Sequence, residues 1–250
     1  MKKILIALIT CVSFTSCAEL LQIVSQTPTT IPVTNAENIL GLKSSLDVGI
    51  EKAVGFLGIE NGFFNDAVLK LLLPPEAKPI IDNLKLIPGG QELVNKAVLS
   101  LNRSAEDAVK EATPIFKNAI RNMTINDAVG ILFGGENAAT QYLRTNTFND
   151  LKSAFAPKVK ESLGKPLLAN FSTNETWDLL SNGYNSIAST PIGLIAGLKT
   201  VNVNLEQYVT EKALDALFLK VAQEEKAIRT DPIARVSTLL KRVFGQLDKK

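Results

Sequence analysis

QELVNKAVLSLNRSAEDAVKEATPIFKNAI, residues 91–120, is the most regular stretch of the sequence. Small and apolar residues recur in it in alternating steps of four and three, which places them along one face of an α-helix. The face consists of Val94, Val98, Leu101, Ala105, Ala108, Ala112, Ile115 and Ala119. Alanine at its centre lets a neighbouring helix approach closely, and Pro114 predicts a kink or a division after Ala112. The stretch predicts a core helix of a bundle; the alternative is a seam that binds a ligand.

Helical spacing continues on both sides of this stretch. It begins near Ile39, and a face formed by Leu42, Leu46, Ile50, Val54 and Leu57 follows. Two shorter helices are predicted in FFNDAVLKLLL (63–73) and EAKPIIDNLKLI (76–87), each ended by proline or glycine. A capping box from Thr124 to Asp127 opens the next helix.

The second half of the chain shows the same pattern. AATQYLR (138–144) and TFNDLKSAF (147–155) are helical with a break near Pro157, and TNETWDLLSNGYNSI (173–187) starts a helix at Thr173 or Asn174. A long helix is predicted from Leu205 to about Arg229, with Val209, Ala213, Leu217 and Val221 inward. After an Asp231–Pro232 start, the last helix is expected to bury Ile233, Val236, Leu240 and Val243 and to end at Gly245.

One segment, TPIGLIAGLKTVNVN (190–204), fits a strand or an irregular apolar loop as well as a helix. Taken together, the patterns predict an all-α protein. We expect a single multi-helix, bundle-like domain of about eight to ten helices behind a flexible N-terminal tether.

The first seventeen residues have the pattern of an export signal. Lys2 and Lys3 give a positive start, residues 4–14 form a short apolar run, and small or hydroxylated residues precede Cys17. These features are typical of a secretory signal peptide. The apolar run would reach only ~17 Å as a helix, about half of the hydrocarbon core of a bilayer, so it is too short to span a membrane.

Cys17 stands where the bacterial lipoprotein lipobox has its acylated cysteine, although Phe14 takes the place usually held by Leu. We expect Cys17 to be acylated and to anchor the mature chain to a membrane, as more than one acyl chain makes anchoring durable. One alternative is an ordinary cleaved signal in which Cys17 is a chance thiol. The other is a disulfide with Cys11, which would be removed with the signal.

The expected domain order is a signal peptide over residues 1–17, a tether over 18–38 and a helical domain over 39–250. The tether combines Thr, Pro, Gln and Asn without sustained periodicity. Ala18 is not the acidic residue that retains some lipoproteins at the inner membrane. We therefore expect an exported protein in the cell envelope, anchored in the outer membrane and facing the periplasm.

Charge argues against a nucleic-acid partner. The 27 Lys and Arg residues become 25 when Lys2 and Lys3 leave with the signal, and they then balance the 25 acidic residues. Nucleic-acid binding requires a basic face. The one local excess is in residues 232–250, where helix-end charge and contact with lipid phosphates are the two alternatives. The basic residues there are Arg235, Lys241, Arg242, Lys249 and Lys250.

The chain has no histidine and no cysteine after Cys17. This excludes Ser-His-Asp and Cys-His catalytic arrangements and zinc sites built on His or Cys. Neither G-x-G-x-x-G nor a P-loop is present. We expect no metal, no cofactor and no enzymatic activity.

Seven segments of the chain resemble one bacterial family, the lipoproteins of domain of unknown function family 4197. They occur in the family's order from about Gly41 to Gly245. The segments are GLKSSLDVGIEKAV, LNRSAEDA, PIFKNAIRNMTINDAVGIL, AATQYLRTNT, YVTEKALDALF, EEKAIRTDPIAR and LLKRVFG. The resemblance implies a helical, exported protein, and it implies no activity and no catalytic residue.

Polar residues within these segments are the candidate site residues. They are Arg103, Glu106, Tyr142, Arg144, Glu225, Arg229, Asp231 and Arg235. Unpaired charges are costly to bury, so interior members must pair with one another. The last four are expected to lock the junction of the final two helices. The alternative is a cleft for an anionic group lined by Arg103, Arg144 and Arg229.

Two functions fit these observations. The first is an envelope lipoprotein that acts by contact with an envelope protein or as a structural component. The second is a helical carrier that holds an apolar or lipid-like ligand in its interior, for which the alanine seam would leave room. A closed core would favour the first, and an elongated apolar pocket the second.

Overall fold

The computed structural model describes residues 32–168 and 170–249. These residues contain ten α-helices and no β-strand, which confirms the all-α prediction. The helices are α2 (Asn35–Leu57), α3 (Lys78–Asp82), α4 (Gly90–Val109), α5 (Ala112–Asn122), α6 (Ala128–Leu132), α7 (Ala138–Gly164), α8 (Thr173–Ala188), α9 (Pro191–Ile195), α10 (Leu205–Thr230) and α11 (Thr238–Phe244). Four short 3₁₀ helices join them: η1 (Pro75–Ala77), η2 (Leu84–Leu86), η3 (Pro232–Ala234) and η4 (Gly245–Lys249). The signal peptide, Cys17 and the tether up to residue 31 lie outside the described residues.

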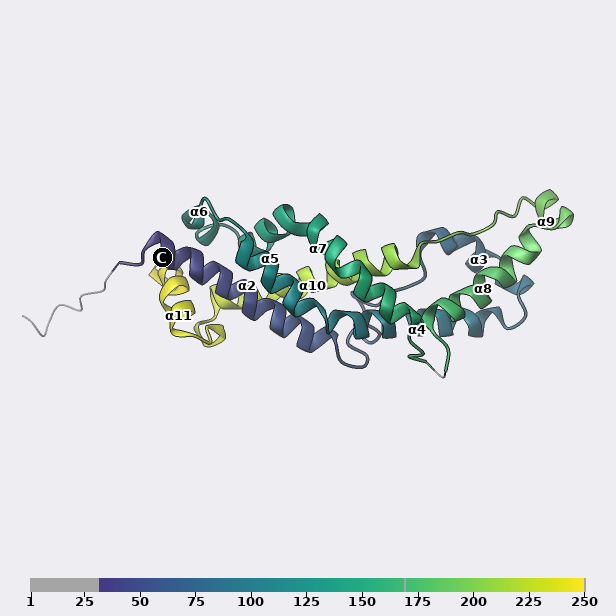
Figure 1. Ribbon diagram of the computed structural model, residues 1–250, viewed down its shortest axis with the longest axis horizontal. Helices are drawn as coiled ribbons and strands as arrows, with labels where there is room; N and C mark the ends of the chain where they lie inside the picture. The colour runs from purple at the N-terminus through teal and green to yellow at the C-terminus, as the bar shows by residue number, and fades with distance from the viewer. Residues whose placement is uncertain (1–31, 169, 250) are drawn as a thin grey trace, which may run out of the picture. The chain divides into compact units, whose positions relative to one another are not determined.

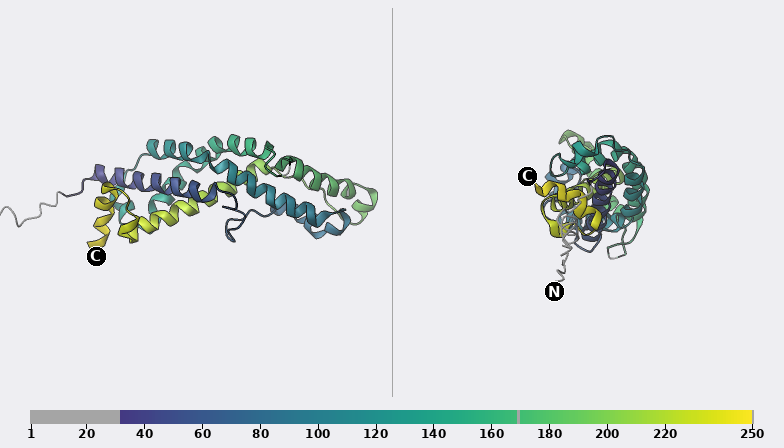
Figure 2. Two further views of the ribbon diagram at one scale, coloured as in Figure 1. Left: turned by 90° about the horizontal axis from the view of Figure 1, so that it is seen from below. Right: turned by 90° about the vertical axis from the view of Figure 1, so that its left-hand side faces the viewer.

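Residues 34–250 form one compact unit, whose central helix is α10. It packs against α2 and against α7, while α4 contacts α7 and pairs with α8 (Figures 1 and 2). The short helices α6 and α11 lie at the end of the unit where α2 begins, and α9 lies at the opposite end (Figure 1). In the described residues no helix is long and apolar enough to cross a membrane.

The α2–α10 contact follows the predicted spacing. Leu42, Leu46, Ile50 and Leu57 are fully buried, and so are the inward positions predicted on the long helix, Val209, Ala213, Leu217 and Val221. Gly49 makes a close approach: a Cβ there would lie 3.0 Å from a methyl group of Val221. Val54, the fifth residue of the predicted face on α2, is only half-buried, and Ala53 is buried beside it. Apart from that position, helical periodicity located the two central faces of the core.

The start of α2 corrects the expected domain boundary. The helix begins at Asn35 and not at Ile39, because Thr34 and Glu37 form a capping box. The Glu37 amide donates to the Thr34 hydroxyl, 3.2 Å away, and the Thr34 amide donates to the Glu37 carboxylate at 2.9 Å. The last residues assigned to the tether, 35–38, are thus part of the helical domain.

The stretch 91–120 divides into α4 and α5, earlier than expected. The break is at residues 110 and 111, so that Pro114 falls in the first turn of α5, where a missing N–H costs nothing. The predicted face stays buried from Leu101 to Ala112. In α5 the core residues are instead Phe116 and Ile120, because the restart rotates the second helix.

The prediction of a helix in residues 63–73 was wrong. Turns replace it, and side chains of α4 bind the backbone at both ends of this segment. Glu106 accepts from the amides of Phe63 and Phe64, at 3.1 and 3.2 Å. The Asn102 side chain accepts from the Leu71 amide at 2.9 Å and donates to the Leu71 carbonyl oxygen at 2.8 Å.

Several predicted helix ends were also wrong. Residues 76–87 form three short pieces, η1, α3 and η2, and α7 continues through Pro157. Ser172, one residue before the expected position, caps α8 through a capping box with Glu175. Asp127 alone caps α6, by accepting from the Gly130 amide.

The structure resolves the one ambiguous segment and corrects the start of the last helix. Residues 190–204 form the five-residue α9 followed by irregular chain. Near the C-terminus, Asp231 caps a 3₁₀ turn and not an α-helix, which leaves Ile233 and Val236 exposed although burial was predicted. Leu240 and Val243 are buried, and Gly245 ends α11, as predicted.

Asn102→Ala tests the role of α4 in ordering residues 63–73. Because the Leu71 amide and carbonyl would lose their partner, we expect the free energy of unfolding to fall by about 1–3 kcal/mol. Urea denaturation followed by circular dichroism measures this change. Asn95→Ala, at an exposed position on the same helix, is the control. Equal losses in the two variants would contradict the assignment.

Candidate functional site

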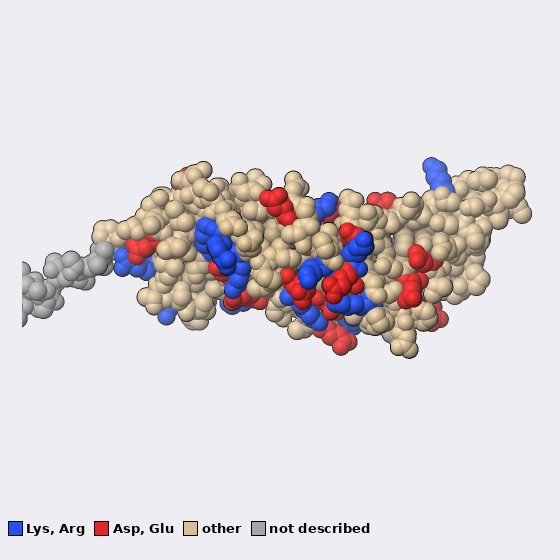
Figure 3. Space-filling view, viewed as in Figure 1, with Lys and Arg blue, Asp and Glu red and all other residues tan. Residues whose placement is uncertain are grey.

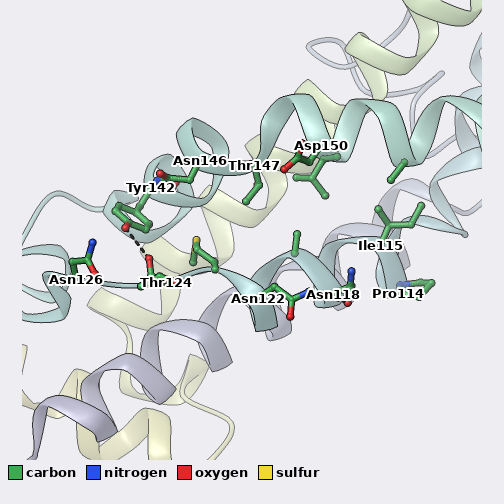
Figure 4. A pocket seen from close by; sticks show the side chains of 14 residues that line it. Pro114, Ile115, Asn118, Asn122, Thr124, Asn126, Tyr142, Asn146, Thr147 and Asp150 are labelled. Carbon is green, nitrogen blue, oxygen red and sulfur yellow. Dashed lines mark hydrogen bonds between the residues drawn. The ribbon is translucent and has the colours of Figure 1, made fainter.

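A surface groove of about 720 Å³ runs between α5 and α7 (Figure 4). Most of its lining residues come from these two helices, and the rest from the segment that follows α5. The lining residues are Pro114, Ile115, Asn118, Ala119, Asn122, Met123, Thr124, Asn126, Tyr142, Asn146, Thr147, Asp150, Leu151 and Ala154. In size the groove is within the range of ligand sites in proteins.

Amide side chains dominate the rim of the groove. Asn118, Asn122 and Asn126 recur every four residues along α5 and beyond its end, and Asn146 comes from α7 (Figure 4). All four are exposed. The face of α5 that holds Phe116 and Ile120 packs into the core, which leaves the asparagine face toward solvent.

Hydrogen bonds position these amides. The Asn122 side chain donates to the Asn118 side-chain oxygen at 3.2 Å, and Asn146 donates to the Tyr142 carbonyl oxygen at 2.7 Å. Tyr142, a predicted site residue, closes one end of the groove, where its hydroxyl donates to the Thr124 carbonyl oxygen at 2.8 Å (Figure 4). That bond joins α7 to the segment after α5.

The rest of the groove is apolar and almost without charge. Met123 and Leu151 are buried beneath it, and Ile115 and Ala154 add methyl groups. Asp150 is the one carboxylate among the lining residues, and no lysine or arginine is among them. Such a surface can offer apolar contact and neutral hydrogen bonds.

The predicted pair of Glu225 and Arg229 lies at the base of α7. Glu225 is 0% exposed, and its carboxylate accepts from the amides of Ala139 and Thr140 at 2.9 and 2.7 Å. Its side chain is thus the N-terminal cap of α7, since Asn137 makes no side-chain cap bond. A carboxylate at a helix N-terminus also interacts favourably with the helix dipole.

Arg229 binds the C-terminal end of α6. Its Nε donates to Glu225 at 2.8 Å, and its two Nη atoms donate to the carbonyl oxygens of Leu132 and Ile131 at 2.6 and 3.0 Å. These carbonyls belong to the last turn of α6, where a cation is favourable. One buried ion pair on α10 therefore caps the end of α6 and the start of α7.

Arg235 extends this junction toward the C-terminus. It is buried and donates to the backbone oxygens of Ile228 and Arg229, at 2.9 and 3.1 Å. Its guanidinium also binds Asp248 in η4 through two bonds, and these bonds hold the pKa of Asp248 below its usual value. Asp231, the fourth predicted member, lies at the surface and accepts from the Ile233 amide.

Arg103 and Glu106 also meet, at a distance from this junction in the sequence and in a different role. Arg103 donates to Glu106 at 2.6 Å and to Asn61 at 3.0 Å. Because Glu106 also binds the amides of Phe63 and Phe64, the pair fastens the turns after α2 to α4. This role is structural.

The alternative of an anion cleft lined by three arginines was wrong. Arg103 pairs with Glu106, Arg229 pairs with Glu225, and Arg144 pairs with Asp215 of α10 at 2.5 Å. Arg144 also stacks over the rings of Phe148 and Phe218. Each guanidinium is satisfied by a different carboxylate, so the fold does not bring the three together.

The basic C-terminal residues are partly taken up in the same way. Arg242 contacts Glu37 of α2 at 3.0 Å, and Arg235 binds Asp248. These two are therefore engaged within the domain and not offered to lipid phosphates. No group of three or more His, Cys, Asp or Glu residues in the described part of the chain could hold a metal ion.

The model of the family described as "Protein of unknown function (DUF4197)" matches residues 32–245. The chain belongs to the DUF4197 family. The resemblance noted in the sequence is thereby confirmed. No curated protein and no solved structure matches the chain.

In this DUF4197 protein, sequence reasoning missed the groove. Of its lining residues, Tyr142 was a predicted site residue, and Ile115 and Ala119 belong to the seam for which ligand binding was the alternative. A signal was present: Asn118 and Asn122 are spaced by four residues, the spacing of one helical face. What the sequence did not show was that α7 would lie opposite that face.

Arg229→Leu tests the capping role of the buried pair in this DUF4197 protein. Glu225 would be left buried without its cation, so we expect the free energy of unfolding to fall by about 3–5 kcal/mol. Urea denaturation measures it. Lys226→Ala removes an exposed pair with Glu136, in which the side chains are 56% and 61% exposed. The free energy of unfolding of that control variant should fall by less than about 1 kcal/mol. Similar losses in both variants would contradict the assignment.

Proposed function

We propose that this protein is a lipid-anchored binding protein of the bacterial cell envelope, without enzymatic activity, that holds an extended segment of a partner polypeptide in the α5–α7 groove. The observation that carries the proposal is the row of asparagine side chains along the groove. It develops the expectation that the protein acts by contact with an envelope protein.

Asparagine suits a polypeptide ligand because each amide offers both a donor and an acceptor. An extended peptide presents the same two groups at every residue, and both must be satisfied when they leave water. Asn118 and Asn122 stand one helical turn apart, about 6 Å, which is close to the length of two residues of extended chain. The row therefore matches the repeat of a peptide backbone.

The apolar floor adds contact area for side chains of such a segment. Met123 is adaptable in shape, and Leu151 and Ile115 give branched surface beside it. The near absence of charge in the lining favours recognition by hydrogen bonds and packing over acid–base chemistry. The complete lack of histidine in the sequence supports the same conclusion.

The cellular setting in this proposal comes from the N-terminal sequence. The export signal and the lipobox-like position of Cys17 support acylation and an outer-membrane anchor that faces the periplasm. The alternative function, an interior carrier of a lipid-like ligand, has less support. The groove is lined by exposed amides at the surface, whereas the alanine seam of α4 is buried in packed core.

The groove can be tested with peptides. Random twelve-residue peptides displayed on phage are selected on the full-length protein, and the affinity of a selected peptide is measured by fluorescence anisotropy. Asn118→Leu with Asn122→Leu should weaken binding by about tenfold or more, because two hydrogen bonds are lost.

Gln91→Leu with Asn95→Leu is the matched control. These residues form the same kind of amide pair on α4, with 3.1 Å between side-chain nitrogen and oxygen, outside the groove. We expect its affinity to equal that of the unchanged protein. Peptides that bind the groove variant as tightly as the control variant would refute the proposal.

Acylation at Cys17 is tested by metabolic labelling with an alkyne analogue of palmitate. Cys17→Ser should abolish incorporation of the label, because the thiol is the attachment point. Cys11→Ser should keep it, because Cys11 lies in the segment that is removed. Absence of label in the unchanged protein would instead support an ordinary cleaved signal.

A further inference from the structure

The five-residue helix α9 presents a concentrated apolar tip. Ile192, Leu194 and Ile195 are 81%, 65% and 88% exposed, and only Gly193 among its residues is buried. The tip lies at the end of the helical unit away from the start of α2 (Figure 1). Three large apolar side chains this exposed on adjacent positions are unusual for a surface in contact only with water.

Most backbone amides of this tip donate hydrogen bonds within the tip. The Thr190 hydroxyl accepts from the Gly193 amide at 3.0 Å, and the Leu194 and Ala196 amides donate to Thr190 and Ile192. The chain closes at Gly197, where φ is +74°, and its amide and that of Leu198 also donate inside the tip. Pro191 has no N–H to satisfy.

These internal hydrogen bonds help to decide whether a lipid bilayer or a protein covers the tip. In hydrocarbon an unsatisfied backbone group costs several kcal/mol, so only a segment with closed hydrogen bonds can enter it. A protein partner could supply such bonds, and an interface of that kind commonly uses them. Most amides of the tip need none.

The charge near the tip also favours a lipid bilayer as its partner. Lys199 is the one charged residue between Asp178 and Glu206, so no acid accompanies the apolar side chains in sequence. Lys199 is exposed and follows the tip directly. On the face shown in Figure 3, the end of the unit that carries α9 is mostly uncharged. A lysine beside an apolar tip matches the phosphates that border the hydrocarbon of a bilayer.

We propose that the α9 tip inserts Ile192, Leu194 and Ile195 into the surface of a lipid bilayer, with Lys199 at the level of the phosphates. This contact is separate from acylation of Cys17 and from the α5–α7 groove. It gives the helical unit a membrane contact of its own, at the end remote from the residue where the unit begins.

The test uses a tryptophan probe in the full-length chain. Trp177→Phe removes the single native tryptophan, and Cys17→Ser prevents acylation. Ile195→Trp then reports on the tip, and Val68→Trp is the matched control, because Val68 is 79% exposed on another part of the unit. Circular dichroism verifies that both variants fold. Vesicles of phosphatidylethanolamine and phosphatidylglycerol carry bromine on their acyl chains.

We expect quenching of the probe at position 195 to exceed that at position 68 by at least about twofold, because bromine quenches only an indole that reaches the acyl chains. Adding Lys199→Glu should reduce the quenching at position 195. Equal quenching of the two probes would overturn the proposal. A blue shift at position 195 that depends on protein concentration and not on vesicles would also overturn it, and would assign the tip to a second copy of the chain.

Discussion

The buried ion pair between Glu225 and Arg229 is the constraint on which the arrangement of the surrounding helices depends. Helix α7 has no side-chain cap of its own, and its first amides bind the Glu225 carboxylate. The last carbonyls of α6 bind Arg229. Two helix ends and two opposite charges thus neutralise one another inside the domain, where each charge alone would be costly. α10 thereby fixes where α6 ends and where α7 starts.

That position of α7 creates the groove. Because Glu225 holds the first turn of α7, the next turn places Tyr142 over the segment after α5, where its hydroxyl binds the Thr124 carbonyl. α7 then runs beside α5, and the groove between the two helices is lined by amide and apolar side chains. The charged residues of the family-like segments therefore position the candidate site, while neutral residues line it.

Elsewhere in the domain, too, paired charged residues join secondary-structure elements, and neutral residues line the proposed binding surfaces. Arg103 and Glu106 order the turns after α2, and Arg235 with Asp248 holds η4 against the end of α10. Near the start of α2, Glu37 contacts Arg242, which brings α11 to that helix. The two surfaces proposed for binding, the groove and the α9 tip, are nearly free of charge by comparison.

Sequence alone determined the helical class and most of the inward faces of α2 and α10, because periodicity is a local property. It predicted that Glu225, Arg229, Asp231 and Arg235 lock the junction of the final two helices. Glu225 and Arg229 instead bind the ends of α7 and α6, and Asp231 lies at the surface. Only the tertiary structure decided that residues 63–73 form turns, which Asn102 and Glu106 of α4 hold by their backbone. The groove was decided in the same way: the asparagine spacing is local, but the helix that faces it is set by a carboxylate 85 residues away along the chain from Thr140. Contacts between residues far apart in sequence leave no periodic trace, so only the folded chain reveals them.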